Sequence, residues 1–313
     1  MCSAPLSNKK FTVFFLSTLG ILILTVILRS AAMLFEFDTP SGYFLHGAIL
    51  PVIFNIICVA SVVFFAVFSI FAFDRNELAI PSVKAPFTLA AILPALASLV
   101  LAWEIWSEFL EISPYISGKE LIFSFAHPIL SLFFVAFLVI YAAGLKNSAL
   151  AAISGILSIF MLAVELTGIY NDLNVSMTSS NKSLLQLSCI VAMLYIYCEL
   201  RVLFGAPQPR FFLFSLSTAT VLLGAYTLPS LLTTAAGIYD NPYTLHDLFF
   251  AAFFILCLVR LIGISKEPIC IEPVADYEVP DEVTEEATEE AIEETTEEPA
   301  EPTEEPEEYP QNS

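Results

Sequence analysis

Charged residues are scarce in this sequence, and the middle of each long apolar run contains almost none of them. Asp, Glu, Lys and Arg make up 14% of its 313 residues, against about 25% in soluble globular domains. Hydrophobic residues account for 57%, and the mean hydropathy is +0.79. This composition excludes an ordinary soluble protein and predicts an integral membrane protein. Because ion and proton pathways usually place an ionisable side chain near the bilayer midplane, it also disfavours an ion-coupled pump.

Motifs for covalent or metal chemistry are also missing. The six cysteines show no CxxC spacing, and four of them lie inside apolar runs. The chain has no GxSxG sequence, which marks the nucleophile elbow of many hydrolases, and no HxxxH or HExxH pair of the kind that zinc-binding membrane hydrolases usually contain. We therefore predict no catalytic residue and no cofactor, and a non-catalytic protein is favoured over an enzyme.

Eight apolar runs are each long enough to cross a membrane as a helix, because about 20 apolar residues span the hydrocarbon core. The predicted helices cover residues 11–29, 47–73, 86–109, 122–145, 148–168, 184–204, 211–236 and 245–265. The first run follows Lys9 and Lys10 like the core of a signal peptide, but it is longer than the usual core of roughly 7–15 residues, so we expect it to be retained. The predicted fold is an all-α polytopic membrane helical bundle.

The basic residues predict the orientation of this bundle. If the N-terminus is cytoplasmic, nine of the twelve Lys and Arg residues fall on the cytoplasmic side, in agreement with the positive-inside rule. The three on the outer side are Arg29, Lys119 and Lys182. We therefore predict a multi-pass protein of the bacterial cytoplasmic membrane, with the lipid bilayer as a partner and with both termini in the cytoplasm.

The net charge of −20 resides almost entirely in the C-terminal segment. From Glu267 onward the sequence has 19 acidic residues and no Lys or Arg, whereas the preceding part has 13 acidic and 12 basic residues. Repeated Thr-Glu-Glu units with interspersed prolines cannot bury a core, so a disordered tail is expected. Three regions are predicted: a short cytoplasmic N-terminus at 1–10, an eight-helix domain at 11–266 and an acidic Glu/Thr/Pro-rich cytoplasmic tail at 267–313. A charged tail of this sign gives no reason to expect a nucleic-acid partner.

The spacing of polar residues suggests an internal repeat. Arg29, Glu104 and Glu165 each lie 18 residues from the inner end of an odd-numbered helix, which places them at one depth, about 27 Å from that end. The three histidines lie at the outer ends of even-numbered helices. We interpret this pattern as four tandem helical hairpins. Common membrane-interface preferences for Tyr, Asp and Asn are the alternative explanation.

Most ionisable groups of the helical region fall at the outer end of the predicted bundle. One interpretation is a polar pocket that binds a solute, with Arg29, Glu104, Glu108, Glu165 and His127 as its binding residues. The alternative is that these groups end helices, solvate loops and pair locally, with Arg29 neutralising Glu104 or Glu165.

A divalent metal site is a further interpretation of the same region. His46, His127 and His246 would supply the imidazoles, together with a carboxylate, because both groups suit Zn²⁺. This interpretation requires the three histidines to converge, although no spacing motif links them.

No motif identifies a substrate. The expected function is that of a non-catalytic membrane protein whose extracytoplasmic polar rim binds a small solute or another membrane protein, and the oligomeric state is open. A small-solute transporter is the first alternative, and it predicts a central polar cavity lined by Asn55, Ser154, Ser158, Ser215 and Thr218. A metal-dependent intramembrane hydrolase is the second.

Overall fold

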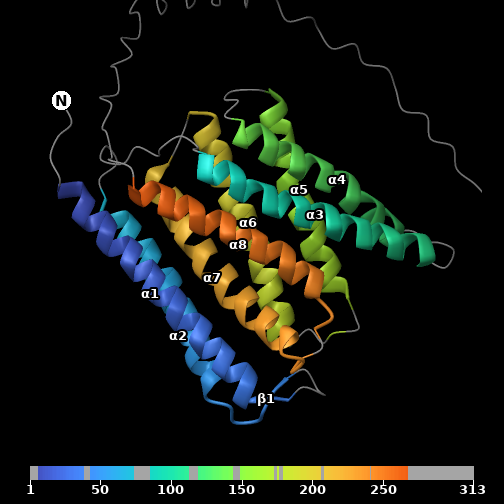
Figure 1. Cartoon of the computed structure of the whole chain (residues 1–313), viewed down its shortest axis with the longest axis horizontal. Coiled ribbons are helices and arrows are strands. Elements are labelled where there is room, and N and C mark those ends of the chain that lie inside the picture. Colours follow the sequence, from blue (N-terminus) through green and yellow to red (C-terminus); the bar gives the residue numbers. More distant parts are fainter. Residues whose placement is uncertain are drawn as a thin grey trace, which may run out of the picture. The chain divides into compact units, whose positions relative to one another are not determined.

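The computed structural model describes residues 6–38, 43–73, 85–112, 119–143, 149–172, 175, 179–205, 208–239 and 241–266. Over these residues the chain forms eight α-helices, each long and apolar enough to cross a membrane (Figure 1). They are α1 (Leu6–Phe35), α2 (Leu50–Phe71), α3 (Ala85–Ile112), α4 (Lys119–Ala142), α5 (Ala149–Asn171), α6 (Ser180–Leu203), α7 (Pro209–Ala235) and α8 (Thr244–Lys266). The predicted acidic tail at 267–313 lies outside the described residues.

The eight predicted helices are confirmed, and all but one of them begin and end within four residues of the predicted positions. The exception is α1, which spans Leu6–Phe35 instead of 11–29. Arg29 was expected to end this helix, but its side chain is buried and the helix continues through the apolar residues that follow it. A charged residue therefore does not mark the helix end here.

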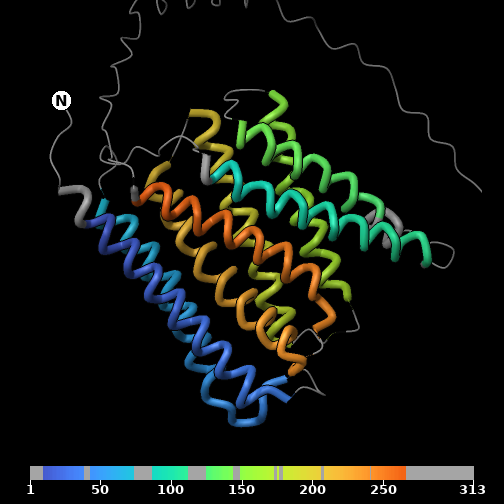
Figure 2. Tube along the Cα trace, in the orientation of Figure 1, coloured from blue at the N-terminus to red at the C-terminus, as the bar shows by residue number. Residues whose placement is uncertain are grey.

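Six of the helices form a closed ring. Each helix from α3 to α8 contacts the next one in the sequence, and α8 contacts α3, so that the order closes on itself. The pair α1 and α2 lies outside this ring and packs against α7, as the tube in Figure 2 shows. Helix α7 is therefore surrounded by α1, α2, α6 and α8.

The most deeply buried helix of the bundle is not one of the most apolar helices. In α7 83% of the apolar window is buried, against 28% in α1 and in α2, yet the sequence of α7 is less apolar than either. Helix α7 instead contains many small residues, among them Ser217, Ala219 and Gly224, which allow neighbouring backbones to approach closely. An added Cβ at Gly224 would lie 2.6 Å from Leu22 of α1 and 2.7 Å from Phe254 of α8.

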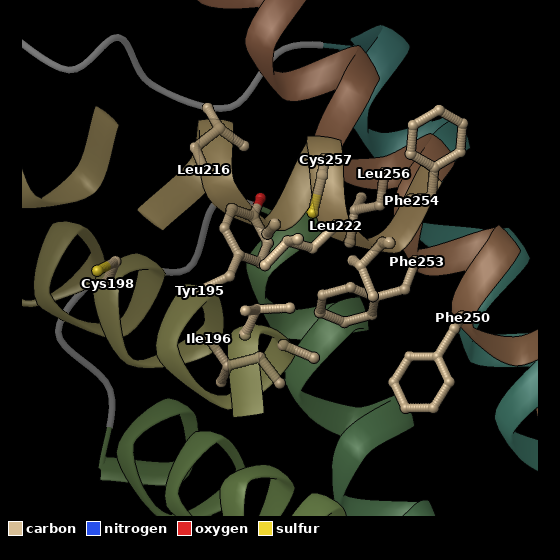
Figure 3. Packing of buried hydrophobic residues seen from close by; sticks show 14 of the residues in the cluster. Tyr195, Ile196, Cys198, Leu216, Leu222, Phe250, Phe253, Phe254, Leu256 and Cys257 are labelled. Atoms are coloured by element: carbon tan, nitrogen blue, oxygen red, sulfur yellow. The ribbon is translucent and has the colours of Figure 1, made fainter. Parts of the chain in front are cut away.

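Aromatic side chains fill the middle of the ring. Phe134 of α4 packs against Phe249 and Phe253 of α8, with ring centroids 5.6 and 6.2 Å apart. Tyr195 of α6 meets Phe253 edge to face at 5.7 Å (Figure 3). All four side chains are buried, and we refer to them as the aromatic layer.

Helices α4 and α8 each carry three residues spaced seven positions apart, and the two sets meet inside the ring. On α4 these are His127, Phe134 and Tyr141, and on α8 they are His246, Phe253 and Arg260. Seven residues are close to two helical turns, so each set lies along one helix face over about 21 Å. The ring thus has an outer layer with histidines, the aromatic layer, and an inner layer with Tyr141 and Arg260.

A short β-hairpin, which the sequence did not predict, connects α1 to α2. Strands β1 (Phe37–Asp38) and β2 (Tyr43–Phe44) pair in antiparallel register. Phe37 packs edge to face against Phe44 at 5.3 Å and against Tyr239 at 5.2 Å, which attaches the hairpin to the segment after α7.

Candidate functional site

The outer layer of the ring is centred on a buried carboxylate held between two histidines. Glu165 lies on α5, and its Oε2 is 2.9 Å from Nε2 of His127 on α4. Its Oε1 is 2.7 Å from Nε2 of His246 on α8. Glu165 is 4% exposed and His127 2%. Three helices that are separate in the sequence therefore meet at one carboxylate.

A cavity of about 410 Å³ lies above this group. Its polar lining consists of Glu104, Glu108, His127, Glu165, Asp172, Tyr243 and His246, and its remaining lining residues are Ile105, Val164, Gly168, Ile169 and Pro242. The volume falls within the range of small-molecule sites, which is about 300–1,000 Å³. We call this space the outer cavity.

The outer cavity is strongly acidic. Glu104, Glu108, Glu165 and Asp172 contribute four carboxylates, and within the described lining there is no Lys or Arg. Glu108 is exposed and Glu104 is half-buried, so two carboxylates stand towards the mouth while Glu165 forms the floor. Walls of low dielectric around carboxylates of one sign concentrate a negative potential.

The rim of the cavity is fixed by hydrogen bonds between loops. Tyr243 donates its hydroxyl hydrogen bond to Oδ2 of Asp172 at 2.5 Å. Burial, together with this bond to a carboxylate, raises the pKa of Tyr243 above its ordinary value, so the phenol stays protonated as a donor. Lys182, which is fully buried in the first turn of α6, donates to the backbone carbonyl of Asp172 and to that of Val175.

Three polar atoms on the cavity floor have no hydrogen bond of ordinary geometry within the described part of the chain. They are both ring nitrogens of His127 and Oε1 of Glu165, although Nε2 of His127 lies 2.9 Å from Oε2 of Glu165 and Oε1 lies 2.7 Å from His246. Buried polar groups are nearly always satisfied in folded proteins, so an unsatisfied one calls for an explanation. His127 and Glu165 both line the outer cavity, so these atoms lie beside its floor.

Comparison of the chain with protein-family models, with curated proteins and with solved structures gives no match. The site is therefore interpreted from its own geometry.

Four of the five predicted binding residues line the outer cavity: Glu104, Glu108, Glu165 and His127. Arg29, the fifth, is not among the lining residues.

Arg29 is fully buried beside α6 instead of neutralising a glutamate. Its guanidinium donates to Oγ of Ser180 at 2.8 Å and to Oδ1 of Asn181. It also lies 4.9 Å from the ring centroid of Phe44 and 5.5 Å from that of Phe54. The carboxylate of Glu165, which the sequence offered as a partner, is occupied by histidines.

Two of the three histidines of the predicted metal site come together. His127 and His246 meet at Glu165, whereas His46 is exposed in the segment between β2 and α2 and does not line the cavity. Across the described residues, no group of three or more His, Cys, Asp or Glu side chains is arranged to hold a metal ion.

The polar path predicted for a transporter does not coincide with the outer cavity. Asn55 is exposed on the outside of the bundle, and the Ser154 and Ser158 hydroxyls donate to carbonyl groups of their own helix. Ser215 and Thr218 are buried in α7. None of the five lines the cavity.

A second buried polar cluster, at the inner end of the ring, was not predicted. Arg260 of α8 donates through Nε to Oε1 of Glu199 of α6 at 3.1 Å, and both side chains are less than 5% exposed. Tyr195 donates to the same oxygen at 2.7 Å, and Tyr141 donates to the other one. The guanidinium also lies over the rings of Phe87 and Phe212. We refer to this group as the inner cluster.

The sequence carried a signal for both clusters that reasoning from individual helices missed. Tyr141 and Arg260 lie two heptads from His127 and His246, on the same helix faces. Reading these two series together would have placed the inner cluster opposite the outer one. Asp172 and Tyr243 have no such signal, because their positions depend on how two loops meet.

Proposed function

We propose that this chain is a multi-pass protein of the cell membrane with both termini in the cytoplasm, built from four tandem helical hairpins and followed by a cytoplasmic acidic tail. Eight helices of sufficient length and apolar character support membrane insertion. The excess of Lys and Arg at one end supports the orientation. Contacts within the pairs α1–α2, α3–α4, α5–α6 and α7–α8 are consistent with hairpin units.

In this orientation the outer cavity opens to the extracytoplasmic side, and we assign to it the binding of a small solute. The observation that carries this proposal is the cavity of about 410 Å³ whose floor is a buried carboxylate between two histidines. Burying three ionisable groups in a membrane protein is costly, so such groups usually mark functional sites.

Solute binding by the wild type, compared with binding by a variant whose cavity is filled by a side chain, tests this function. Thermal unfolding of the purified protein would be followed in detergent with a panel of amino acids, sugars, amines, carboxylates and nucleosides at millimolar concentration. A bound solute stabilises the folded state, and for a protein of this size each kcal/mol raises Tm by about 2–4 °C. We expect at least one compound to raise Tm in the wild type but not in Gly168→Trp, because Gly168 lines the cavity and has open space beside it.

Gly20→Trp provides the matched control. Gly20 lies on an exposed face of α1, also with open space around its Cα, so its substitution should preserve the response of the wild type. If no compound acts, or if Gly168→Trp responds as the wild type does, the outer cavity is not a solute site.

A further inference from the structure

The charges around the outer cavity define the sign of its occupant. Four lining carboxylates face it, and within the described lining the other ionisable groups are the imidazoles of His127 and His246 and the phenol of Tyr243. Even with both imidazoles protonated, the carboxylates stay in excess. A cation would therefore be drawn into the cavity, whereas an anion would be repelled.

The orientation of His127 defines a hydrogen-bond donor on the occupant. Its Nε2 lies 2.9 Å from Oε2 of Glu165 without a hydrogen bond of ordinary geometry. The other nitrogen is Nδ1, and a ring nitrogen that carries no proton is an acceptor that an N–H or O–H group completes. It is buried and has no acceptor or donor opposite it in the described structure. A cationic ligand that pairs with it therefore carries an N–H or O–H group.

The remaining walls favour an organic group over a bare metal ion. Ile105, Val164, Ile169 and Pro242 give the cavity an apolar side. A divalent ion requires several converging ligands, and no set of three is found within the described residues. The space is also far larger than an ion needs, and it suits an ammonium group with an apolar substituent.

We infer that the outer cavity binds a small organic ammonium ion, with its N–H groups directed to the floor formed by His127 and Glu165 and to the surrounding carboxylates, and with its apolar part against the wall formed by Ile105, Val164 and Ile169. This inference rests on the proposed solute-binding function and narrows it to one chemical class.

Four compounds that share a phenethyl group separate charge from hydrogen bonding: phenethylamine, phenethyl alcohol, hydrocinnamate and phenethyltrimethylammonium. Binding to the full-length protein in detergent would be measured by thermal shift. We expect phenethylamine to stabilise the wild type and to lose this effect in Gly168→Trp, which also controls for partition into micelles. The alcohol and the carboxylate should have no effect, and the trimethylammonium ion, which lacks N–H groups, should bind at least about tenfold more weakly.

A matched pair of glutamate variants on α3 tests the carboxylates. Glu108 is exposed and lines the cavity, so Glu108→Gln should weaken phenethylamine binding about tenfold without affecting the fold. Glu111 is exposed on the same helix but does not line the cavity, and Glu111→Gln should bind as the wild type does.

The inference is overturned if hydrocinnamate or phenethyl alcohol stabilises the wild type as well as the amine does, or if the two glutamine variants behave alike. If compounds of another class stabilise the wild type but not Gly168→Trp, the ammonium assignment fails while the solute-binding function stands. If no compound of any class acts, both fail.

Discussion

Glu199 and Arg260 form a deeply buried ion pair, in which each charge is stabilised by the other. Removing either partner leaves a charge in the interior, which typically costs about 3–5 kcal/mol. Replacing both by apolar groups of similar size is often close to neutral. The two tyrosine hydroxyls that also donate to Glu199 add to this network.

We therefore predict strong non-additivity at the inner cluster. Glu199→Leu and Arg260→Met should each lower the free energy of unfolding by about 3–5 kcal/mol, and the double variant should lose less than the sum. Equilibrium unfolding in detergent measures all three. Arg201→Met, two positions beyond Glu199 on a more exposed part of α6, should cost less than about 1 kcal/mol. Additive losses would show that the pair does not act as a unit.

At the scale of residues, the sequence predicted which side chains gather at the outer end but not how they pair. Glu104, Glu108, Glu165 and His127 were expected together because they share a depth, and depth follows from position along a helix. Arg29 shares that depth as well, yet it lies against Ser180 and Asn181. The depth of a residue does not determine how its helix is rotated about its axis, or which helices lie beside it. Rotation and neighbouring helices decide which side chains meet.

Helix α7 is the element on which the packing of the bundle depends most. It contacts α1, α2, α6 and α8, and its residue Gly224 allows α1 and α8 to approach it from two sides. A side chain at this position would overlap Leu22 and the ring of Phe254. Overpacking of a tight core typically costs about 1–3 kcal/mol or more.

We predict that Gly224→Leu lowers Tm in detergent by several degrees. Gly263→Leu, in an exposed position of α8 with nothing within 4 Å of the added Cβ, should have little effect. Both variants make the same chemical change, so the difference between their Tm values isolates the close contact. Equal Tm values would show that α7 does not pack tightly against α1 and α8.

The existence of the helices was predictable, whereas their neighbours were not. Long apolar runs specify spans because a backbone in lipid must form its own hydrogen bonds. Lipid tails are as apolar as the helices, so hydrophobicity does not separate a lipid-facing side from a packed one. The small residues of α7 were visible in the sequence and would have been the better guide to its central place.

For the whole molecule, the described conformation favours binding over passage. The outer cavity ends at Glu165, and the aromatic layer of Phe134, Phe249, Phe253 and Tyr195 fills the ring below it. The inner cluster follows at the opposite end. A solute that enters from outside would therefore reach the His–Glu–His floor and stop there.

The most direct test of this account is the labelling of single cysteines in intact cells with a membrane-impermeant maleimide. The four described cysteines are buried, so a background with Cys2→Ser and Cys270→Ser should be silent. Gly168→Cys places a thiol in the exposed lining of the outer cavity, and Phe204→Cys places one at the other end of the bundle, just after α6. The account predicts that Gly168→Cys reacts in intact cells and that Phe204→Cys reacts only after permeabilisation. The opposite pattern, or no reaction at Gly168→Cys under either condition, would contradict it.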